Sequence, residues 1–304
     1  MDPDIADVEF LDEALSAPLN QDYALIAEII AQPLDNDYYR QRSVDYTEKP
    51  EVPAYLGACW GVSGLHLPGA FRSWEHWAGP KCLTIGPPLY LDRPIYQYQY
   101  ESLRWFDHWL RGKYVGIEEE KPVRVFVEGA AVWKEGDTWP FPETRWTPFY
   151  LHNDGWLNEH ELFDHDSTTS FDDKPDSHGE VEFWTGGIVE KTELCGPIVL
   201  NLFAETDADE VLWFVSLLHR NSEGVERLLT RGWLRGSHRQ LDQEKSQPWL
   251  PYHAHNERIP VPPGDVVEYN IEIRPYGIEL QPGEQLGLRI KCADDEKPGD
   301  PLQA

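Results

Sequence analysis

The stretch Ile85-Gly-Pro-Pro-Leu-Tyr-Leu-Asp-Arg-Pro94 joins two parts of the chain that differ in sequence pattern. A short apolar run, Cys82 to Ile85, predicts a strand that ends in a Gly-Pro loop. The segment Tyr98 to Gly112 (YQYESLRWFDHWLRG) follows with apolar residues at helical spacing and a final glycine, which predicts a helix. The next segment, Pro122 to Val127, alternates as a strand does. This order of strand, loop, helix and strand decides how the chain divides.

Upstream of this join the pattern is that of an α/β protein. Residues 1–48 have a helical pattern, and a strand at Ala54 to Cys59 leads through a glycine-rich loop to a helix near Phe71 to Trp77. Strands that alternate with helices indicate parallel pairing. Two such strands are too few for an independent doubly wound sheet. We therefore expect residues 1–116 to be the tail end of a larger α/β domain, whose open strand edge favours association with a second copy.

Downstream of Gly112 the sequence has a period of two residues. Apolar residues alternate with polar or bulky ones in the runs 123–127, 198–204, 267–273 and 286–292. This alternation predicts antiparallel strands with one buried face. Val211 to Leu218 is apolar on both faces, so we expect a central strand there. Short strands separated by turns are typical of a β-sandwich, and we predict a self-sufficient sandwich of jelly-roll type over residues 117–304.

Composition and charge argue against several kinds of partner. The 304 residues carry a formal net charge of −28, which repels nucleic-acid backbones, so we expect no nucleic-acid partner. No apolar run reaches the roughly 18 residues of a membrane span, and the first residues lack a signal-peptide pattern, so we expect a soluble protein without a membrane partner. The four cysteines lie far apart, which predicts buried reduced thiols and a cytoplasmic location.

The chain contains no serine in the setting that an α/β-hydrolase gives its nucleophile. Such a serine sits on a sharp turn between a strand and a helix, usually as G-x-S-x-G, where the glycines allow the turn. Of all the serines, Ser63 alone has a glycine two residues before it, Gly61, and Leu65 occupies the place of the second glycine. The sequence therefore predicts that this chain holds no serine nucleophile.

Gly57-Ala-Cys59-Trp-Gly61 fits the thiol version of this motif, G-x-C-x-G, and follows a predicted strand. A cysteine nucleophile needs a histidine base nearby and a carboxylate that orients the base. The motif must also lead directly into a helix, whereas Gly64, Pro68 and Gly69 predict an irregular chain for about ten residues. We therefore interpret Cys59 as a small buried thiol at the end of a strand.

Two loops resemble those that carry the catalytic aspartate and histidine in the cocaine esterase / X-Pro dipeptidyl-peptidase (CocE/NonD) serine hydrolases. Trp60-Gly-Val62-Ser-Gly-Leu-His66-Leu-Pro-Gly69 is similar to the aspartate loop. On that alignment the aspartate position falls on Val62, and the histidine position after the Gly-Pro pair falls on Tyr90. Valine cannot orient an imidazolium, and tyrosine is a poor base near neutral pH. His66 and Asp92 are close enough in sequence to substitute, although an ion-paired loop carboxylate is the simpler expectation for Asp92.

The resemblance continues in the same order along the rest of the chain. The matching segments are 103–110, 122–127, 146–151, 230–237 and 286–290. It implies that residues 1–116 are the cap segment and last strands of an α/β-hydrolase domain. It also implies acyl transfer from a small-molecule ester or peptide substrate to serine, without a cofactor. Because the nucleophile is missing, we expect the chain to be inactive alone; the alternative is a non-catalytic β-sandwich binding module or pseudoenzyme.

Several tryptophans are candidates for a binding surface. Those that follow the join and could line a carbohydrate or aromatic pocket are Trp133, Trp139, Trp146 and Trp156. Trp105 and Trp109 lie four residues apart on one face of the predicted helix, and we expect that face to pack against the sandwich.

The histidines give no sign of a metal site. The candidates in the second half of the chain are His219, His238, His253 and His255. Their spacing matches no zinc-binding pattern, and prolines flank the closest pair. We therefore expect no metal.

Overall fold

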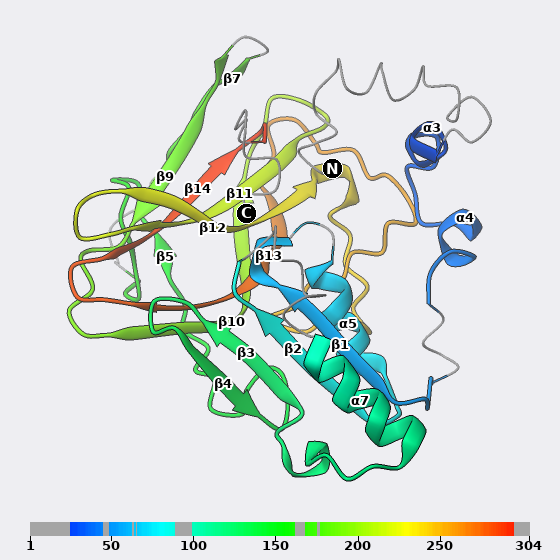
Figure 1. Ribbon diagram of the computed structural model, residues 1–304. Coiled ribbons are helices and arrows are strands. Elements are labelled where there is room, and N and C mark those ends of the chain that lie inside the picture. Colours follow the sequence, from blue (N-terminus) through cyan, green and yellow to red (C-terminus); the bar gives the residue numbers. More distant parts are fainter. Residues whose placement is uncertain are drawn as a thin grey trace, which may run out of the picture.

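The computed structural model describes residues 25–44, 49–62, 64, 66–88, 99–161, 168–174 and 177–294. Figure 1 shows two sheets beside each other, with helices packed against the smaller one. Two short helices, α3 (Leu25–Ile30) and α4 (Asp37–Arg40), lie at the side of the molecule. They confirm the helical pattern for this part of the N-terminal region, while residues 1–24 lie outside the described ones.

The smaller sheet has the strand order β1-β2-β3-β4 within the described residues. Its strands are β1 (Ala54–Cys59), β2 (Lys81–Gly86), β3 (Val123–Val127) and β4 (Val132–Gly136). β1, β2 and β3 run parallel, and β4 returns antiparallel to β3. Helix α5 (Leu67–His76) lies between β1 and β2 in the chain, and α7 (Gln99–Arg111) lies between β2 and β3. Helical crossovers of this kind let parallel strands end at the same edge.

β3 belongs to this smaller sheet, although the sequence pattern assigned it to the sandwich. It pairs with β2 through Leu83 with Val123 and Ile85 with Val125, and both valines are completely buried. An alternating pattern indicates that one face of a strand is buried, but it does not identify the neighbouring strand. The sheet therefore continues across the boundary predicted between residues 116 and 117.

The two longer helices differ from the sequence expectation. α5 begins at Leu67 because Pro68 fits the first helical turn, where its missing N–H is not needed. On α7, Trp105 packs edge-on against Tyr55 of β1 with ring centroids 5.6 Å apart, so this face covers the smaller sheet rather than the sandwich. Trp109, which was expected to pack with Trp105, is exposed, and so are the other large hydrophobic side chains of α7: Tyr100, Leu103, Phe106 and Leu110. None of the helices within the described ranges combines the length and the hydropathy that a membrane span needs.

The larger sheet is antiparallel and has the order β10-β13-β12-β11-β14-β9 within the described residues. Its strands are β9 (Glu180–Trp184), β10 (Thr192–Ala204), β11 (Leu212–Arg220), β12 (Glu226–Arg235), β13 (Val267–Leu280) and β14 (Gln285–Lys291). β11 lies between β12 and β14, which confirms the predicted central strand.

Smaller elements complete the β-sandwich part of the chain. Two hairpins pair β5 (Tyr150–Leu151) with β6 (Leu157–Asn158) and β7 (Asp173–Lys174) with β8 (Ser177–His178). Among the described residues, the short 3-10 helices η4 (Ile117–Glu119) and η5 (Gly236–His238) lie in this part, whereas η3 (Trp60–Val62) follows β1 of the smaller sheet. The strands and their antiparallel pairing agree with the β-sandwich that the period-two runs predict.

The two sheets share one hydrophobic core, in which Leu83 and Val123 of the smaller sheet belong to the same cluster as residues of β13. A short bridge joins the sheets after β3. The Glu128 N–H donates to the Gly277 carbonyl at 2.9 Å, and the Glu279 N–H donates to the Glu128 carbonyl at 2.8 Å. The next residue, Gly129, has φ +78°, and a Cβ there would lie 2.3 Å from the Glu279 carbonyl oxygen. Glycine is therefore required where the sheets meet.

Candidate functional site

The carboxyl ends of β1 and β2 form one edge of the smaller sheet. The last residues of the two strands, Cys59 and Gly86, are neighbours in register. The loops that follow also touch, because a Cβ on Gly61 would lie 3.3 Å from the backbone of Pro88. In open α/β sheets, ligands bind in the crevice outside the carboxyl ends of the strands. This edge is therefore the first candidate site.

The predicted site residues are only partly within the described structure. Val62 ends the short η3 helix directly after β1, and exposed His66 precedes α5, so both lie in the loop at this edge. Tyr90 and Asp92 lie outside the described residues. The assignment of Val62 and Tyr90 to the aspartate and histidine positions, with His66 and Asp92 as substitutes, therefore stays a prediction.

Cys59 is the last residue of β1 and is 3% exposed. A nucleophile must reach its substrate, so this burial agrees with a packed thiol rather than a reactive one. The irregular segment after it is shorter than the sequence predicted, because α5 already begins at Leu67. Burial raises the pKa of Cys82 to about 11 and the pKa values of Cys195 and Cys292 to about 12, which keeps these thiols protonated at neutral pH.

The larger sheet approaches the loop after β1 through an aromatic residue that sequence reasoning did not select. Trp233 of β12 would lie 3.7 Å from a Cβ on Gly64. The Arg274 guanidinium of β13 lies over the Trp233 ring, 5.0 Å from its centroid. Arg274 also pairs with Glu272 at 2.7 Å, and Glu272 lies 3.6 Å from Arg72 of α5. A continuous line of polar and aromatic contacts therefore connects the edge to α5.

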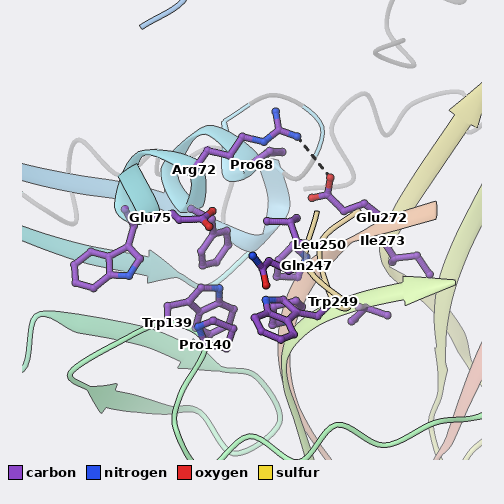
Figure 2. Close-up of a pocket in the computed structure, with 15 residues that line it drawn as sticks. Pro68, Arg72, Glu75, Trp139, Pro140, Gln247, Trp249, Leu250, Glu272 and Ile273 are labelled. Carbon is purple, nitrogen blue, oxygen red and sulfur yellow. Dashed lines mark ion pairs between the residues drawn. The ribbon is translucent and has the colours of Figure 1, made fainter. Parts of the chain in front are cut away.

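A cavity of about 330 Å³ opens beside this line of contacts. It lies between α5 and the larger sheet, and Figure 2 shows Trp139 and Trp249 among the side chains that enclose it. The segments that contribute to its wall are 68–75, 139–140, 197–198, 247–250 and 272–275. Arg72 and Glu272 line the cavity and also belong to the contacts described above. The cavity is therefore a second candidate site, adjacent to the first.

The structure separates the four tryptophans that the sequence grouped as a pocket. Trp139 lines the cavity. Trp146 does so only indirectly, because it stacks on the lining residue Trp249 with ring centroids 4.8 Å apart. Trp133 packs against Phe126 instead, and half-exposed Trp156 forms a bridge with Trp184 at the sheet edge. Trp249 was missed because its segment, 247–250, carries no periodic pattern. Its place in the wall follows from the tertiary fold.

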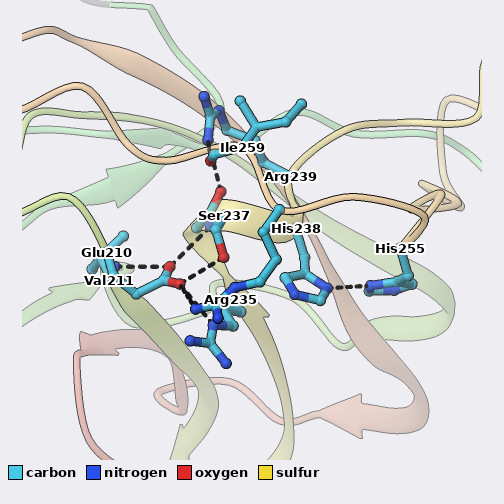
Figure 3. A network of polar contacts seen from close by, with 10 residues as sticks. Glu210, Val211, Arg235, Ser237, His238, Arg239, His255 and Ile259 are labelled. Carbon is cyan, nitrogen blue, oxygen red and sulfur yellow. Dashed lines mark hydrogen bonds and ion pairs between the residues drawn. The ribbon is translucent and has the colours of Figure 1, made fainter. Parts of the chain in front are cut away.

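A polar network around Glu210 has the chemistry of a stabilising cluster (Figure 3). The Glu210 carboxylate accepts hydrogen bonds from the Ser237 N–H and hydroxyl at 2.9 and 2.6 Å, and from Arg235 at 2.7 Å. Arg258 adds a contact at 3.2 Å. Burial alone would raise the pKa of Glu210, but these hydrogen bonds outweigh it and lower the pKa to about 2. Ser237 is 3% exposed, so its hydroxyl holds the carboxylate rather than attacking a substrate.

Three histidines that are distant in sequence meet beside this network. The Nδ1 atoms of His238 and His255 lie 3.0 Å apart, and the rings of His253 and His255 are 5.8 Å apart. Burial lowers the pKa of all three, that of His253 to about 4, so the neutral imidazole is favoured. Within the described part of the chain, no group of three His, Cys, Asp or Glu side chains is arranged to hold a metal ion.

Comparison with known protein families identifies a match over more than half of the chain. The family described as the X-Pro dipeptidyl-peptidase C-terminal non-catalytic domain matches residues 115–302. The match includes the larger sheet together with β3 and β4.

Individual proteins give a consistent result. A Mycobacterium bovis protein, whose name gives serine esterase as a provisional assignment, is 28% identical over 264 residues, covering 76% of this chain and 41% of that protein. The cocaine esterase of Rhodococcus sp. is 41% identical over 54 residues, covering 18% of this chain and 9% of the esterase. A CocE/NonD family hydrolase from Staphylococcus aureus has a TM-score of 0.77 at 24% identity, covering 90% of this chain and 52% of the hydrolase.

The chain thus spans about two fifths of the mycobacterial relative and about half of the solved hydrolase. Because this chain and the solved hydrolase are only 24% identical, their structural similarity shows that they share a fold.

Proposed function

The chain belongs to the family of X-Pro dipeptidyl-peptidase C-terminal non-catalytic domains, and on this premise we propose that it provides the sandwich side of a CocE/NonD-type serine hydrolase without hydrolysing substrate itself. The intact reaction would be acyl transfer from a small-molecule ester or peptide to a serine, followed by hydrolysis. In this proposal the smaller sheet is the tail end of an α/β-hydrolase domain, and the larger sheet belongs to a jelly-roll sandwich.

The lack of a usable nucleophile carries the proposal. The sequence has no G-x-S-x-G, and the one thiol that fits a comparable motif, Cys59, is 3% exposed. In this proposal, as the resemblance of the two loops implies, Val62 and Tyr90 stand at the positions of the aspartate and the histidine. An imidazole held by a carboxylate is what makes a serine hydroxyl nucleophilic near neutral pH. Without these groups, the chain has no means of forming an acyl-enzyme.

The larger sheet would instead shape the substrate cleft. Trp233 reaches the loop after β1, and Arg274 lies over its indole ring. A substrate bound at the carboxyl edge of β1 and β2 would meet this aromatic surface from the sandwich side. A division between residues 116 and 117 would describe the chain order of the two parts and not the sheets, because β3 and β4 follow residue 117 and belong to the smaller sheet.

Ester hydrolysis by the purified chain tests the proposal. The chain and its Cys59→Ala variant are incubated with p-nitrophenyl acetate and with p-nitrophenyl butyrate, and nitrophenol release is followed. We expect both proteins to match the rate of the buffer alone. Turnover that Cys59→Ala abolishes would revive the thiol nucleophile, and turnover that survives the substitution would require another nucleophile in this chain. Either result contradicts the proposal.

A second candidate function is a binding module or pseudoenzyme. The cavity between α5 and the larger sheet favours it, because such a cavity binds a ligand without any catalytic group. The exposed apolar side chains of α7, Leu103, Phe106 and Leu110, also offer a surface for association with a second copy of the chain. Saturable ligand binding by a chain that leaves the ester unchanged would support this second function.

A further inference from the structure

The cavity described above has two stacked aromatic walls. Trp139 stacks on Phe71 of α5, with ring centroids 4.8 Å apart and planes at 25°. Trp249 stacks on Trp146, with centroids 4.8 Å apart and planes at 18°. Trp139 and Trp249 therefore each rest against a second ring, which fixes their orientation. Rigid aromatic walls lose little conformational entropy when a flat ligand packs on them.

The remaining wall residues add rigid apolar surface. Prolines at four positions line the cavity: Pro68, Pro140, Pro197 and Pro275. Trp74 also lines the cavity, and its side chain is 8% exposed because most of it is packed in the hydrophobic core. A volume of about 330 Å³ lies in the range of small-molecule sites, which are of the order of 300 to 1,000 Å³. The cavity therefore suits a compact ligand of one ring or two.

Four polar side chains also face the cavity: Arg72, Glu75, Gln247 and Glu272. Figure 2 shows Gln247 next to Trp249. The Arg72–Glu272 ion pair lies at the opposite end of the view from Trp139 and Trp249. Planar carboxylate, amide and guanidinium groups can each hydrogen-bond two neighbouring hydroxyl groups. This combination suits a ring with apolar faces and a hydroxylated edge.

The charges near the cavity favour an uncharged ligand. Arg72 and Glu272 pair at 3.6 Å, and Arg274, which does not line the cavity, pairs with Glu272 at 2.7 Å. Glu75 adds a second negative charge, so the four charges cancel. The net charge of −28 on the whole chain opposes an anion, and the two guanidinium groups oppose a cation. A purely apolar ligand would leave the Gln247 and Glu75 side chains without partners as it removed water.

We propose that this cavity is a binding site for a neutral hydroxylated ring, a pyranose sugar unit, which stacks between Trp139 and Trp249 and presents its hydroxyl edge to Gln247, Glu75 and the Arg72–Glu272 pair. The site does not use the loops after β1 and β2. It is therefore independent of the proposed hydrolase role, whereas it rests on the cavity that favours the second candidate function and names the ligand class of that binding module.

Titration of the full chain with simple glycosides tests this proposal. The probes are methyl β-D-glucopyranoside, methyl β-D-galactopyranoside and methyl α-D-mannopyranoside, with phenol as a flat aromatic probe that carries one hydroxyl group. Binding is followed by saturation-transfer NMR and tryptophan fluorescence. We expect at least one glycoside to bind saturably with a Kd of about 1 mM or lower, an affinity that a few hydrogen bonds and one stacked ring can supply. Absence of saturable glycoside binding, or saturable binding of phenol alone, overturns the sugar assignment.

Three variants locate the binding. Trp249→Ala removes one stacking wall and should raise the Kd about tenfold. Gln247→Leu changes an exposed side chain whose turn is held by backbone hydrogen bonds to Leu250, so the fold is retained and the Kd should still rise several-fold. Trp156→Ala, the matched control, removes a half-exposed tryptophan outside the cavity and should leave the Kd unchanged. A glycoside Kd that is the same in Gln247→Leu as in the unaltered chain, or equal losses in Trp249→Ala and Trp156→Ala, contradicts the proposal.

Discussion

The indole Nε1–H of Trp60 donates a 2.7 Å hydrogen bond to the carbonyl oxygen of Phe126. Trp60 directly follows β1 and is 1% exposed, whereas Phe126 lies on β3, two strands away in the smaller sheet. The Trp60 ring also packs against Tyr276 of the larger sheet, with centroids 5.5 Å apart. One side chain therefore connects the loop of the candidate site to both sheets.

Replacing Trp60 by phenylalanine should destabilise the whole chain. Trp60→Phe keeps an aromatic ring but leaves the Phe126 carbonyl without this donor, which costs about 1–3 kcal/mol of unfolding free energy. Urea denaturation followed by circular dichroism measures the loss. Trp156→Phe, at a half-exposed position, should change the free energy by less than about 0.5 kcal/mol. Equal effects of the two substitutions would show that the buried hydrogen bond is unimportant.

The Glu210 network should make stability fall in acid. The folded-state pKa of Glu210, about 2, lies below the ordinary value of 4.5. Its contribution is therefore present above pH 4.5 and is lost as the pH falls from 4.5 towards 2. Glu210→Gln cannot titrate, so the difference in unfolding free energy between it and the unaltered chain should shrink over this window. Glu205→Gln, at an exposed position outside the network, should show no such change; a constant difference for Glu210→Gln would refute the assignment.

Partly buried His253 should act in a higher pH window. Burial lowers the pKa of His253 to about 4 from the ordinary 6.5, so protonation favours the unfolded chain. Stability from neutral His253 is present above pH 6.5 and is lost as the pH falls to 4. His253→Leu removes this titration and should show a smaller fall in unfolding free energy between these pH values. Exposed His66→Gln serves as the control and should follow the unaltered chain. Identical pH profiles for His253→Leu and the unaltered chain would contradict the interpretation.

The shared core predicts the behaviour of a shortened chain. A chain that begins at Glu118 lacks β1 and β2, so β3 loses its parallel neighbour and the buried Val123 and Val125 become exposed. We expect it to be less soluble than the full chain and to unfold in a broader transition, measured by calorimetry. The sequence pattern favoured the opposite, because the sandwich was expected to cover itself. A sharper transition at higher temperature in the shortened chain would contradict this expectation and support a domain boundary at residue 117.

The sequence was informative where local pattern determines structure. The apolar run at Val211 to Leu218 predicted a central strand, because a strand that is covered on both faces has no face exposed to solvent. The corresponding strand, β11, lies between β12 and β14 inside the larger sheet. The family resemblance rested on short segments in a fixed order, and the family match over residues 115–302 confirms the family, although the two loops at 60–69 and 85–94 lie outside that match. Both inferences depend on residues that are adjacent in the chain.

The sequence was not informative where the contacts are distant. Alternation at Val123 to Val127 could not tell β2 from a sandwich strand as the neighbour, because pairing depends on register and tertiary packing. His238 and His255 meet across 17 residues, and Trp249 reaches the cavity from a segment without periodicity. Trp233 became a site residue only through its approach to Gly64. No spacing rule connects these positions before the sheets are assembled.

Covalent labelling tests the absence of a nucleophile most directly. The purified chain is incubated with an alkyl fluorophosphonate, which phosphonylates an activated serine, and the intact mass is then measured. Our account predicts that the mass does not change, because no serine of the sequence lies in a G-x-S-x-G motif and Ser237 is buried against Glu210. A stoichiometric adduct on any serine of this chain would show that it carries its own nucleophile and would contradict the account.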